Sequence, residues 1–343
     1  MRILHVTVSD RFAGVEQFIR RLAELQAADG HEVFVAGGDA GRMAPPLRAA
    51  GVSFVPATRL REALTAIRSA DVDVVNSHMT AADTAAVLAG LITRRGPALV
   101  STRHFALRRG SRGPSIAYRA VEHLLDAEIS ISRAVAESIG VASTIVHPGV
   151  DPVEMSESER THTVLMAQRL QPEKDTAVGV RAFAASGLAA AGWRLEIAGT
   201  GPQERWLRTL ADDLGLGDAV AFLGFRDDLP ELMRSAGMLL ATSPFEHFGL
   251  TVLEAMASGL PVIASDAGGH AEMLRPLAEA ALYAPGDAAD AAALLAAVAA
   301  DAPRRARLGE VQLRRQLESF TLRAQADATE AVYRRAIAQR GGR

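Results

Sequence analysis

The chain contains no cysteine among its 343 residues. Disulfide bonds, thiolate metal ligands and cysteine nucleophiles are therefore excluded, and the composition fits a reducing compartment. Any catalysis must use other side chains.

A membrane-spanning segment is also missing from the sequence. No run of about 20 apolar residues occurs, because the alanine-rich stretch Ala288 to Ala300 is shorter and contains Asp290. The first ten residues carry one basic residue, and His5 lies inside their short apolar stretch. They predict a first strand rather than a signal peptide. We therefore expect a soluble, cytoplasmic protein.

The sequence has little net charge of either sign. Lys and Arg number 37 and Asp and Glu number 40, which gives a net charge of −3. No general polycationic field attracts nucleic acid, so no nucleic-acid partner is expected and any basic patch must be local.

The length predicts more than one domain. A chain of 343 residues exceeds the size at which a single hydrophobic core usually keeps growing. Apolar residues make up 49% and charged residues 22% of the chain, as in ordinary globular proteins. We expect an N-terminal domain at 1–155, a second domain at 160–325, and a C-terminal helix at 326–343 that packs back towards the first domain.

Short β-branched runs alternate with helical patterns in both halves, which predicts two α/β domains with doubly wound parallel sheets. The expected strands of the first half are Ile3 to Val8, Glu32 to Ala36, Val52 to Val55, Val72 to Asn76, Leu99 to Thr102 and Glu128 to Ser132. Those of the second half are Val164 to Ala167, Arg194 to Ala198, Ala219 to Leu223, Met238 to Thr242 and Val262 to Ser265. Such folds bind ligands beyond the carboxyl ends of their strands, so the cleft between the domains is the expected site.

The segment from Ser243 to Gly259 carries the strongest chemical signal. A strand ends before a proline, an irregular stretch follows, and a short helix begins near Phe248 or Gly249. Unpaired amides at a helix N-terminus favour an anionic phosphate, and glycine lets it approach closely. Glu246 lies before this helix and Glu254 inside it, so the carboxylates are expected to hold different parts of a ligand rather than to act as a glycosidase pair.

This segment resembles the signature of the retaining glycosyltransferases of GT-B fold in the large sucrose-synthase-like family, also described as family 4 or group 1. The match consists of two glutamates separated by seven residues and followed by Ala255 to Asp266. It extends to Ala167 to Lys174, where Gln168 replaces a usual glycine, and to Ala198 to Pro202 and Phe222 to Phe225. The first domain matches more weakly.

The resemblance implies specific roles in a donor site. Arg169 and Lys174 would be cations on the diphosphate, and Glu254 would accept hydrogen bonds from the ribose hydroxyls. Glu246, with the amides of Phe248 to Leu250, would hold the transferred sugar. Gly14 would meet the phosphates, and His104 would face the sugar from the first domain. The full set of expected donor contacts is Gly14, Arg169, Lys174, Phe225, Glu246, Phe248, Gly249, Leu250, Thr251 and Glu254.

Two cations and helix amides stabilise the charge that develops on the departing diphosphate, so no metal and no cofactor are expected. The predicted enzyme is thus a retaining glycosyltransferase that moves a hexose or related sugar from a nucleotide sugar, such as a UDP- or GDP-sugar. The acceptor is a glycan, a lipid-linked or a small molecule. The alternatives are a nucleotide-sugar epimerase, a phosphorylase of the same architecture, or a non-catalytic nucleotide-sugar-binding module.

A cluster of arginines in the first domain leaves two interpretations open. The cluster comprises Arg103, Arg108, Arg109, Arg112 and Arg119. It is either a solvated face or a surface for peripheral contact with an anionic membrane or a lipid-phosphate acceptor.

Overall fold

The computed structural model describes residues 1–91, 96–109, 121–153 and 159–341, and within them the chain forms two compact units. Unit 1 combines Met1–Gly149 with Leu322–Arg343, and unit 2 is Val150–Thr321. The chain thus passes from unit 1 to unit 2 at residue 150 and returns to unit 1 at residue 322.

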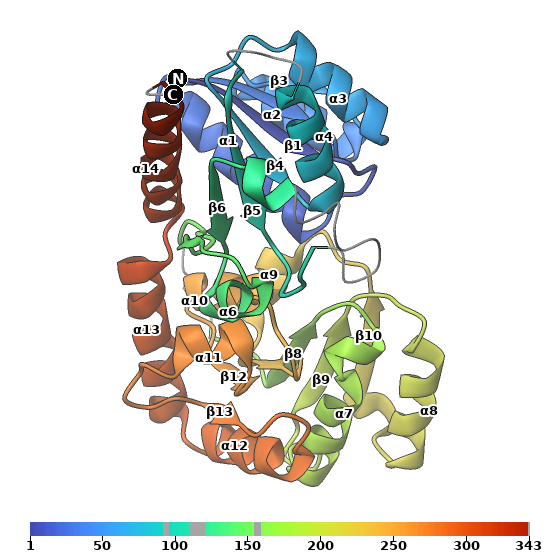
Figure 1. Ribbon diagram of the computed structural model, residues 1–343. Coiled ribbons are helices and arrows are strands. Elements are labelled where there is room, and N and C mark those ends of the chain that lie inside the picture. The colour runs from blue at the N-terminus through green and yellow to red at the C-terminus, as the bar shows by residue number, and fades with distance from the viewer. Residues whose placement is uncertain (92–95, 110–120, 154–158, 342–343) are drawn as a thin grey trace. The chain divides into compact units, whose positions relative to one another are not determined.

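Unit 1 is built on a parallel sheet of seven strands in the order β3-β2-β1-β4-β5-β6-β7 (Figure 1). The strands are β1 (Arg2–Thr7), β2 (Glu32–Ala36), β3 (Ser53–Val55), β4 (Val74–His78), β5 (Ala98–Arg103), β6 (Ala127–Ser130) and β7 (Thr144–Ile145). The strand order reverses between β1 and β4, and a doubly wound sheet leaves room for a ligand beyond the carboxyl ends of strands at such a point.

Helices cover both faces of this sheet. They are α1 (Gly14–Ala28), α2 (Ala40–Ala49), α3 (Leu60–Ser69), α4 (Thr80–Gly90), α6 (Arg133–Ile139) and α14 (Leu322–Gly341). Helix α14 packs along α1 and against β5 and β6 (Figure 1). Its Val332 and Tyr333 are buried in one core cluster with Ile3, Val74 and Val100. The first and last segments of the chain therefore share a hydrophobic core.

Unit 2 repeats the architecture with six parallel strands in the order β10-β9-β8-β11-β12-β13. The strands are β8 (Thr163–Ala167), β9 (Arg194–Ala198), β10 (Val220–Gly224), β11 (Met238–Ala241), β12 (Val262–Ser265) and β13 (Leu282–Tyr283). The helices are α7 (Thr176–Ala185), α8 (Glu204–Asp213), α9 (Leu229–Ser235), α10 (Leu250–Ala257), α11 (Gly268–Leu274), α12 (Ala288–Ala300) and α13 (Ala302–Ser319), with short 3₁₀ turns η1 (Pro172–Lys174) and η2 (Gly217–Ala219). The order reverses between β8 and β11.

The predicted fold class, two doubly wound α/β units, is confirmed. The boundaries of single strands differ by one or two residues; β4, for example, runs over Val74–His78 rather than Val72 to Asn76. Strands β7 and β13 were not predicted, because two residues are too few to show an alternating pattern. In the ranges that the structure describes, no helix combines the length and apolarity needed to cross a bilayer.

Tyr333 provides a test of how far α14 stabilises unit 1. The side chain is fully buried, and its hydroxyl accepts a hydrogen bond from Asn76 Nδ2 at 2.6 Å. We expect Tyr333→Ala to lower the free energy of unfolding by about 3–5 kcal/mol, the range for removing a buried aromatic ring. Urea denaturation would measure this, with Arg334→Ala on the exposed side of the same helix as the control. An effect no larger than that of the control would show that α14 is not part of the core.

Candidate functional site

The loop between β11 and α10 brings a carboxylate and a helix N-terminus together. Phe248 is 2% exposed and anchors this loop in the core. Gly249 has φ of +100° and precedes the first residue of α10, and a Cβ there would lie 2.8 Å from His270 Cδ2. Only glycine fits these conditions without strain. The helix begins at Leu250, so its first amides have no partner within the helix.

A second loop, between β8 and α7, carries the basic groups. Its turn η1 ends at Lys174, and Asp175 with φ of +47° redirects the chain into α7. The side-chain amide of Gln168 donates to Thr176 Oγ1 and to Thr242 Oγ1, both at 2.9 Å. Gln168 thereby ties the residue after β8 to the first residue of α7 and to the residue after β11. This explains how the chain accommodates glutamine where the family usually has glycine.

Lys174 and Glu246 join the two loops. Lys174 Nζ lies 2.6 Å from Glu246 Oε2, and the amide of His247 donates to Glu246 Oε1 at 3.1 Å. The two side chains are only 21% and 12% exposed. Burial raises the pKa of Glu246, but the nearby ammonium of Lys174, with His270 and His247, outweighs this, so the pKa lies below its ordinary value. The pair is therefore ionised at neutral pH, in a partly dehydrated setting where charge acts strongly.

Gly268 and Gly269, which the sequence analysis did not single out, allow the start of α11 to pack directly against the Glu246 loop. A Cβ on Gly268 would lie 1.9 Å from the carbonyl oxygen of Glu246, and one on Gly269 would lie 2.0 Å from that of Phe248. The amide of Gly269 donates to the Glu246 carbonyl at 3.0 Å. No side chain fits between α11 and the loop. The signal in the sequence was the Gly-Gly pair directly after Ala267, just past the end of the matched signature.

His270 was also missed. It is 2% exposed, and its Nδ1 lies 3.2 Å from Ser265 Oγ, which donates its own proton to the carbonyl of Ser243. Nδ1 must therefore donate to Ser265, and Nε2, on the side of Gly249, carries no proton. Burial lowers the pKa of His270 to about 4, so the ring is neutral. It packs behind the helix N-terminus.

The remaining predicted residues of unit 2 lie at different distances from this pair. The guanidinium of Arg169 is exposed and pairs with Glu173 at 3.4 Å rather than with Glu246. Glu254 is the fifth residue of α10, so it lies inside the helix that follows Glu246. Its side chain is partly buried. Thr251 is in the first turn of α10. Phe225 follows β10 and is 59% exposed.

The predicted residues of unit 1 lie at two strand ends. His104 directly follows β5 and is 7% exposed, and its Nε2 lies 2.9 Å from Nδ1 of His78, the last residue of β4. Gly14 is the first residue of α1, which follows β1. The carboxylate of Glu16 accepts the amide proton of Ala13 at 2.9 Å and so caps this helix start.

Two family models match adjacent parts of the chain. The model described as "Glycosyltransferase Family 4" matches residues 12–154, and the one described as "Glycosyl transferases group 1" matches residues 152–314. The chain belongs to this family of glycosyltransferases. The second match contains Lys174, Glu246 and Glu254, and the first contains Gly14 and His104.

The chain also resembles known proteins, in sequence and in structure. The lipopolysaccharide core biosynthesis mannosyltransferase LpsB of Rhizobium meliloti is 30% identical over 231 residues, which are 61% of this chain and 65% of LpsB. The chain thus aligns with less than two thirds of this relative. HepE of Anabaena, solved with UDP and glucose, superposes with a TM-score of 0.82 at 20% identity, covering 97% of this chain and 99% of HepE. Sucrose-phosphate synthase of Thermosynechococcus elongatus gives 0.74 at 20% identity, over 99% and 100%. The structural matches confirm the GT-B fold.

The interpretation of the arginine cluster requires a correction. Arg103 and Arg109 are each only 6% exposed, so neither can form a solvated face or touch a membrane. Arg109 lies 2.8 Å from Asp83 Oδ2 and 2.5 Å from Glu128 Oε1, and Arg103 lies 3.4 Å from Glu128. Both arginines neutralise buried carboxylates. Arg108 is exposed, and Arg112 and Arg119 lie outside the described residues.

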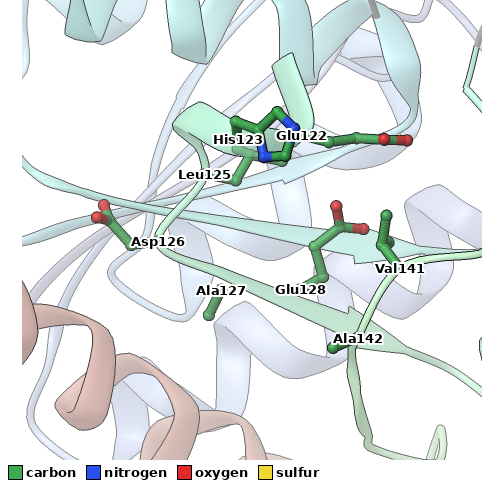
Figure 2. A pocket seen from close by; sticks show the side chains of 8 residues that line it. All are labelled: Glu122, His123, Leu125, Asp126, Ala127, Glu128, Val141 and Ala142. Atoms are coloured by element: carbon green, nitrogen blue, oxygen red, sulfur yellow. The ribbon is translucent and has the colours of Figure 1, made fainter. Parts of the chain in front are cut away.

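A pocket of unit 1 lies elsewhere than the predicted site. It has a volume of about 340 Å³ and is lined by residues around the start of β6 and the turn before β7, among them Glu122, Asp126 and Glu128 (Figure 2). Arg109 lies near two of these carboxylates, at 3.9 Å from Glu122 and 2.5 Å from Glu128. Asp126 is held by Arg340 of α14. The carboxylates are therefore engaged internally.

The Lys174–Glu246 pair can be tested through stability. The pKa of Glu246 is lower in the folded protein than in the unfolded chain, where it is about 4.3. The pair therefore stabilises the wild type fully above that unfolded-state pKa. This stabilisation is lost as the pH falls through the folded-state pKa of Glu246. In Lys174→Ala the ammonium that opposes the effect of burial is absent, so we expect the pKa of Glu246 to rise. We expect this variant to lose about 1–3 kcal/mol relative to wild type between about pH 4 and pH 7.

Urea denaturation at several pH values would measure the difference. Adding Glu246→Gln to Lys174→Ala should remove most of the pH dependence, and Arg169→Ala, which removes an exposed pair, serves as the control. A loss in Lys174→Ala that is the same at every pH would contradict an ionised pair.

Proposed function

We propose that this protein is a retaining, metal-independent glycosyltransferase that moves a hexose from a UDP- or GDP-sugar to a hydroxyl of a glycan, lipid-linked or small-molecule acceptor. The observation that carries the proposal is the partly buried Lys174–Glu246 ion pair beside the N-terminus of α10. A cation, a carboxylate and unpaired amides at one place match a ligand that contains both phosphate and sugar hydroxyls.

The proposed donor contacts divide between phosphate and hydroxyl groups. Lys174 spends one of its three ammonium protons on Glu246 and has others for the diphosphate, to which Arg169 is proposed to turn from its exposed loop. Glu246 and the amides of Phe248 to Leu250 would hold the sugar. Glu254 would bind the ribose, with Thr251 and Phe225 as further donor contacts.

Composition supports a special role for Lys174. It is the only lysine in the chain, whereas the other 36 of the 37 basic residues are arginines. At every other position with a Lys or Arg side chain, that side chain is arginine. A compact ammonium at this position can donate to the carboxylate and to a phosphate at the same time. A planar guanidinium instead favours bidentate contact with a single carboxylate or phosphate.

The chemistry follows from where charge develops. Breaking the anomeric bond leaves a nucleoside diphosphate that gains negative charge, which Lys174, Arg169 and the start of α10 would stabilise. A departing phosphate oxygen would take the proton of the attacking hydroxyl on the same face, so that the anomeric configuration is retained. Gly14 and His104 would act on the same donor, at its phosphates and at its sugar.

Two relatives support a nucleotide sugar as the substrate. HepE was solved with UDP and glucose, and LpsB is named a mannosyltransferase. The alternatives are an epimerase or phosphorylase of the same architecture and a non-catalytic binding module. An epimerase would return a changed nucleotide sugar without transfer, a phosphorylase would require free phosphate, and a binding module would release no nucleotide at all.

The single lysine offers a direct test of donor binding. Labelling with ¹³C-lysine leaves the ammonium unmodified and labels only Lys174. A thermal-shift screen against UDP-, GDP- and ADP-sugars identifies the donor, since a tight ligand raises the apparent stability. We expect that donor to move the ¹³Cε resonance of Lys174. A bound donor that leaves the Lys174 resonance unchanged would remove this residue from the site.

The proposed role of Lys174 also predicts kinetics. Lys174→Ala should lower kcat by roughly 10²-fold, the scale of losing one preorganised group that stabilises developing charge. Lys174→Arg should rescue it only partly, because the guanidinium cannot keep both contacts. Nucleotide release measures kcat, and ¹H NMR of the product reports the anomer. An inverted product would refute retention, and an unchanged kcat would refute the role of Lys174.

Peripheral membrane contact stays a proposal for the arginines of the cluster other than the buried Arg103 and Arg109. We expect flotation with anionic liposomes to weaken in a variant that lacks Arg108, Arg112 and Arg119, because each basic residue near an anionic surface contributes about 1 kcal/mol. Replacement of Arg205, a basic residue of α8 in unit 2, is the control. Flotation that does not depend on lipid charge would contradict the proposal.

A further inference from the structure

Three histidines of unit 1 form a continuous hydrogen-bonded row. His5 lies in β1, His78 ends β4 and His104 follows β5, so the row crosses three strands that are adjacent in the sheet. His5 Nδ1 lies 3.1 Å from His78 Nε2, and His78 Nδ1 lies 2.9 Å from His104 Nε2. At its inner end, His5 Nε2 lies 2.8 Å from Oε1 of Gln26 in α1.

The row is shielded from water. His5 and His78 are fully buried and Gln26 is 2% exposed, whereas His104 at the outer end is 7% exposed. Phe18 of α1 packs edge-on against the outer two rings, with ring centroids 4.9 Å from His104 and 5.9 Å from His78. Only the His104 end of the row is therefore open towards the carboxyl ends of the strands.

The rings are neutral because charge cannot be hydrated there. Burial lowers the pKa of His5 to about 4 and that of His104 to about 3, and burial together with its two imidazole neighbours lowers the pKa of His78 well below its ordinary value. At neutral pH each imidazole thus carries one proton, on one of its two nitrogens.

With the carbonyl oxygen of Gln26 facing His5, counting protons along the row gives the nitrogen that carries each one. The carbonyl oxygen of Gln26 only accepts, so His5 Nε2 donates to it and His5 Nδ1 has no proton. His78 Nε2 must then donate to His5 Nδ1, which leaves His78 Nδ1 to accept from His104 Nε2. All three protons are used within the row, and Nδ1 of His104 has none. No hydrogen-bond partner for that nitrogen occurs among the described residues.

We propose that Gln26, His5 and His78 are positioning residues that hold His104 in the Nε2-protonated tautomer, so that its Nδ1 accepts a hydrogen bond from a hydroxyl of the transferred sugar. This inference rests on the proposed function, since it deepens the role assigned there to His104. A ring whose pKa is about 3 is too weak a base to remove the hydroxyl proton. His104 therefore orients the hydroxyl and does not deprotonate it.

The opposite arrangement is chemically distinct and can be recognised. Turning over the Gln26 amide would make its NH2 group donate to His5, would reverse every proton in the row, and would leave Nδ1 of His104 protonated. His104 would then present a donor instead of an acceptor. The two states differ in which nitrogen of each ring is protonated, which ¹⁵N chemical shifts report directly.

The first test needs no ligand. In ¹⁵N-histidine-labelled protein, with His104 assigned through His104→Gln, we expect Nε2 of His104 to be protonated and Nδ1 unprotonated from about pH 8 down to about pH 5. In Gln26→Leu the inner acceptor is lost, and a buried N–H without a partner is costly. The row should reverse, and the two nitrogen shifts of His104 should exchange. A protonated Nδ1 in the wild type, or an unchanged His104 in Gln26→Leu, would overturn the proposal.

A matched control separates this effect from loss of a buried glutamine. Gln325 of α14 lies in the same unit, is 3% exposed and accepts from the amide of Gly149. Gln325→Leu should destabilise unit 1 to a similar degree without changing the ¹⁵N shifts of His104. A His104 exchange of equal size in both variants would show a general structural response and overturn the proposal.

The second test measures function with UDP-glucose, or with whichever UDP-, GDP- or ADP-sugar gives turnover. Gln26→Leu should lower kcat/KM by about 3- to 10-fold, the range for one hydrogen bond, while Gln325→Leu leaves it within about twofold. An exchanged tautomer with unchanged kcat/KM would overturn the positioning role. A wild type that turns over no nucleotide sugar would refute the proposed function instead, and the ¹⁵N shifts would still decide whether the row fixes the tautomer.

Discussion

The candidate site of unit 2 depends on the salt bridge between Lys174 and Glu246. It joins the loop after β8 to the loop after β11, the two strands between which the sheet order reverses. Each partner is held from another direction: Gln168 bonds the turn behind Lys174, and Gly268 and Gly269 let α11 pack beneath Glu246. A partly buried ion pair with this much support contributes less to stability than to fixing the position of its charges, since desolvation offsets much of its Coulomb energy.

The two units handle polar groups in opposite ways. In unit 2 the central pair is ionised, and an ammonium lowers the pKa of the buried carboxyl group. In unit 1 the central row consists of neutral imidazoles whose pKa values burial has lowered. The first arrangement suits a ligand that carries or develops charge. The second suits hydroxyl groups, which need a defined donor or acceptor but no charge, and which a charged ring would hold less selectively.

The sequence was sufficient to predict the fold class and to single out Lys174 and Glu246, which the structure joins in an ion pair, because both predictions depend on local patterns. Strand and helix alternation occurs within short windows, and Glu246, Gly249 and Glu254 belong to one signature. The histidine row could not be predicted in this way. His5, His78 and His104 are far apart in the chain, and only the order β1-β4-β5 makes them neighbours. The arginine cluster failed for the same reason, since the carboxylates that bury Arg109 come from α4 and β6.

Helix α14 is synthesised after unit 2, so unit 1 cannot complete its fold until then. Residues 1–149 leave the ribosome first, yet their sheet lacks one covering helix until residues 322–341 have been synthesised. Unit 2 lies between and can fold earlier, because its core is drawn from residues 150–321 alone. Tyr333 arrives beside Asn76, on the same face as Gln26 at the inner end of the histidine row. The face of the early sheet that α14 covers is thus a natural client for chaperones during translation.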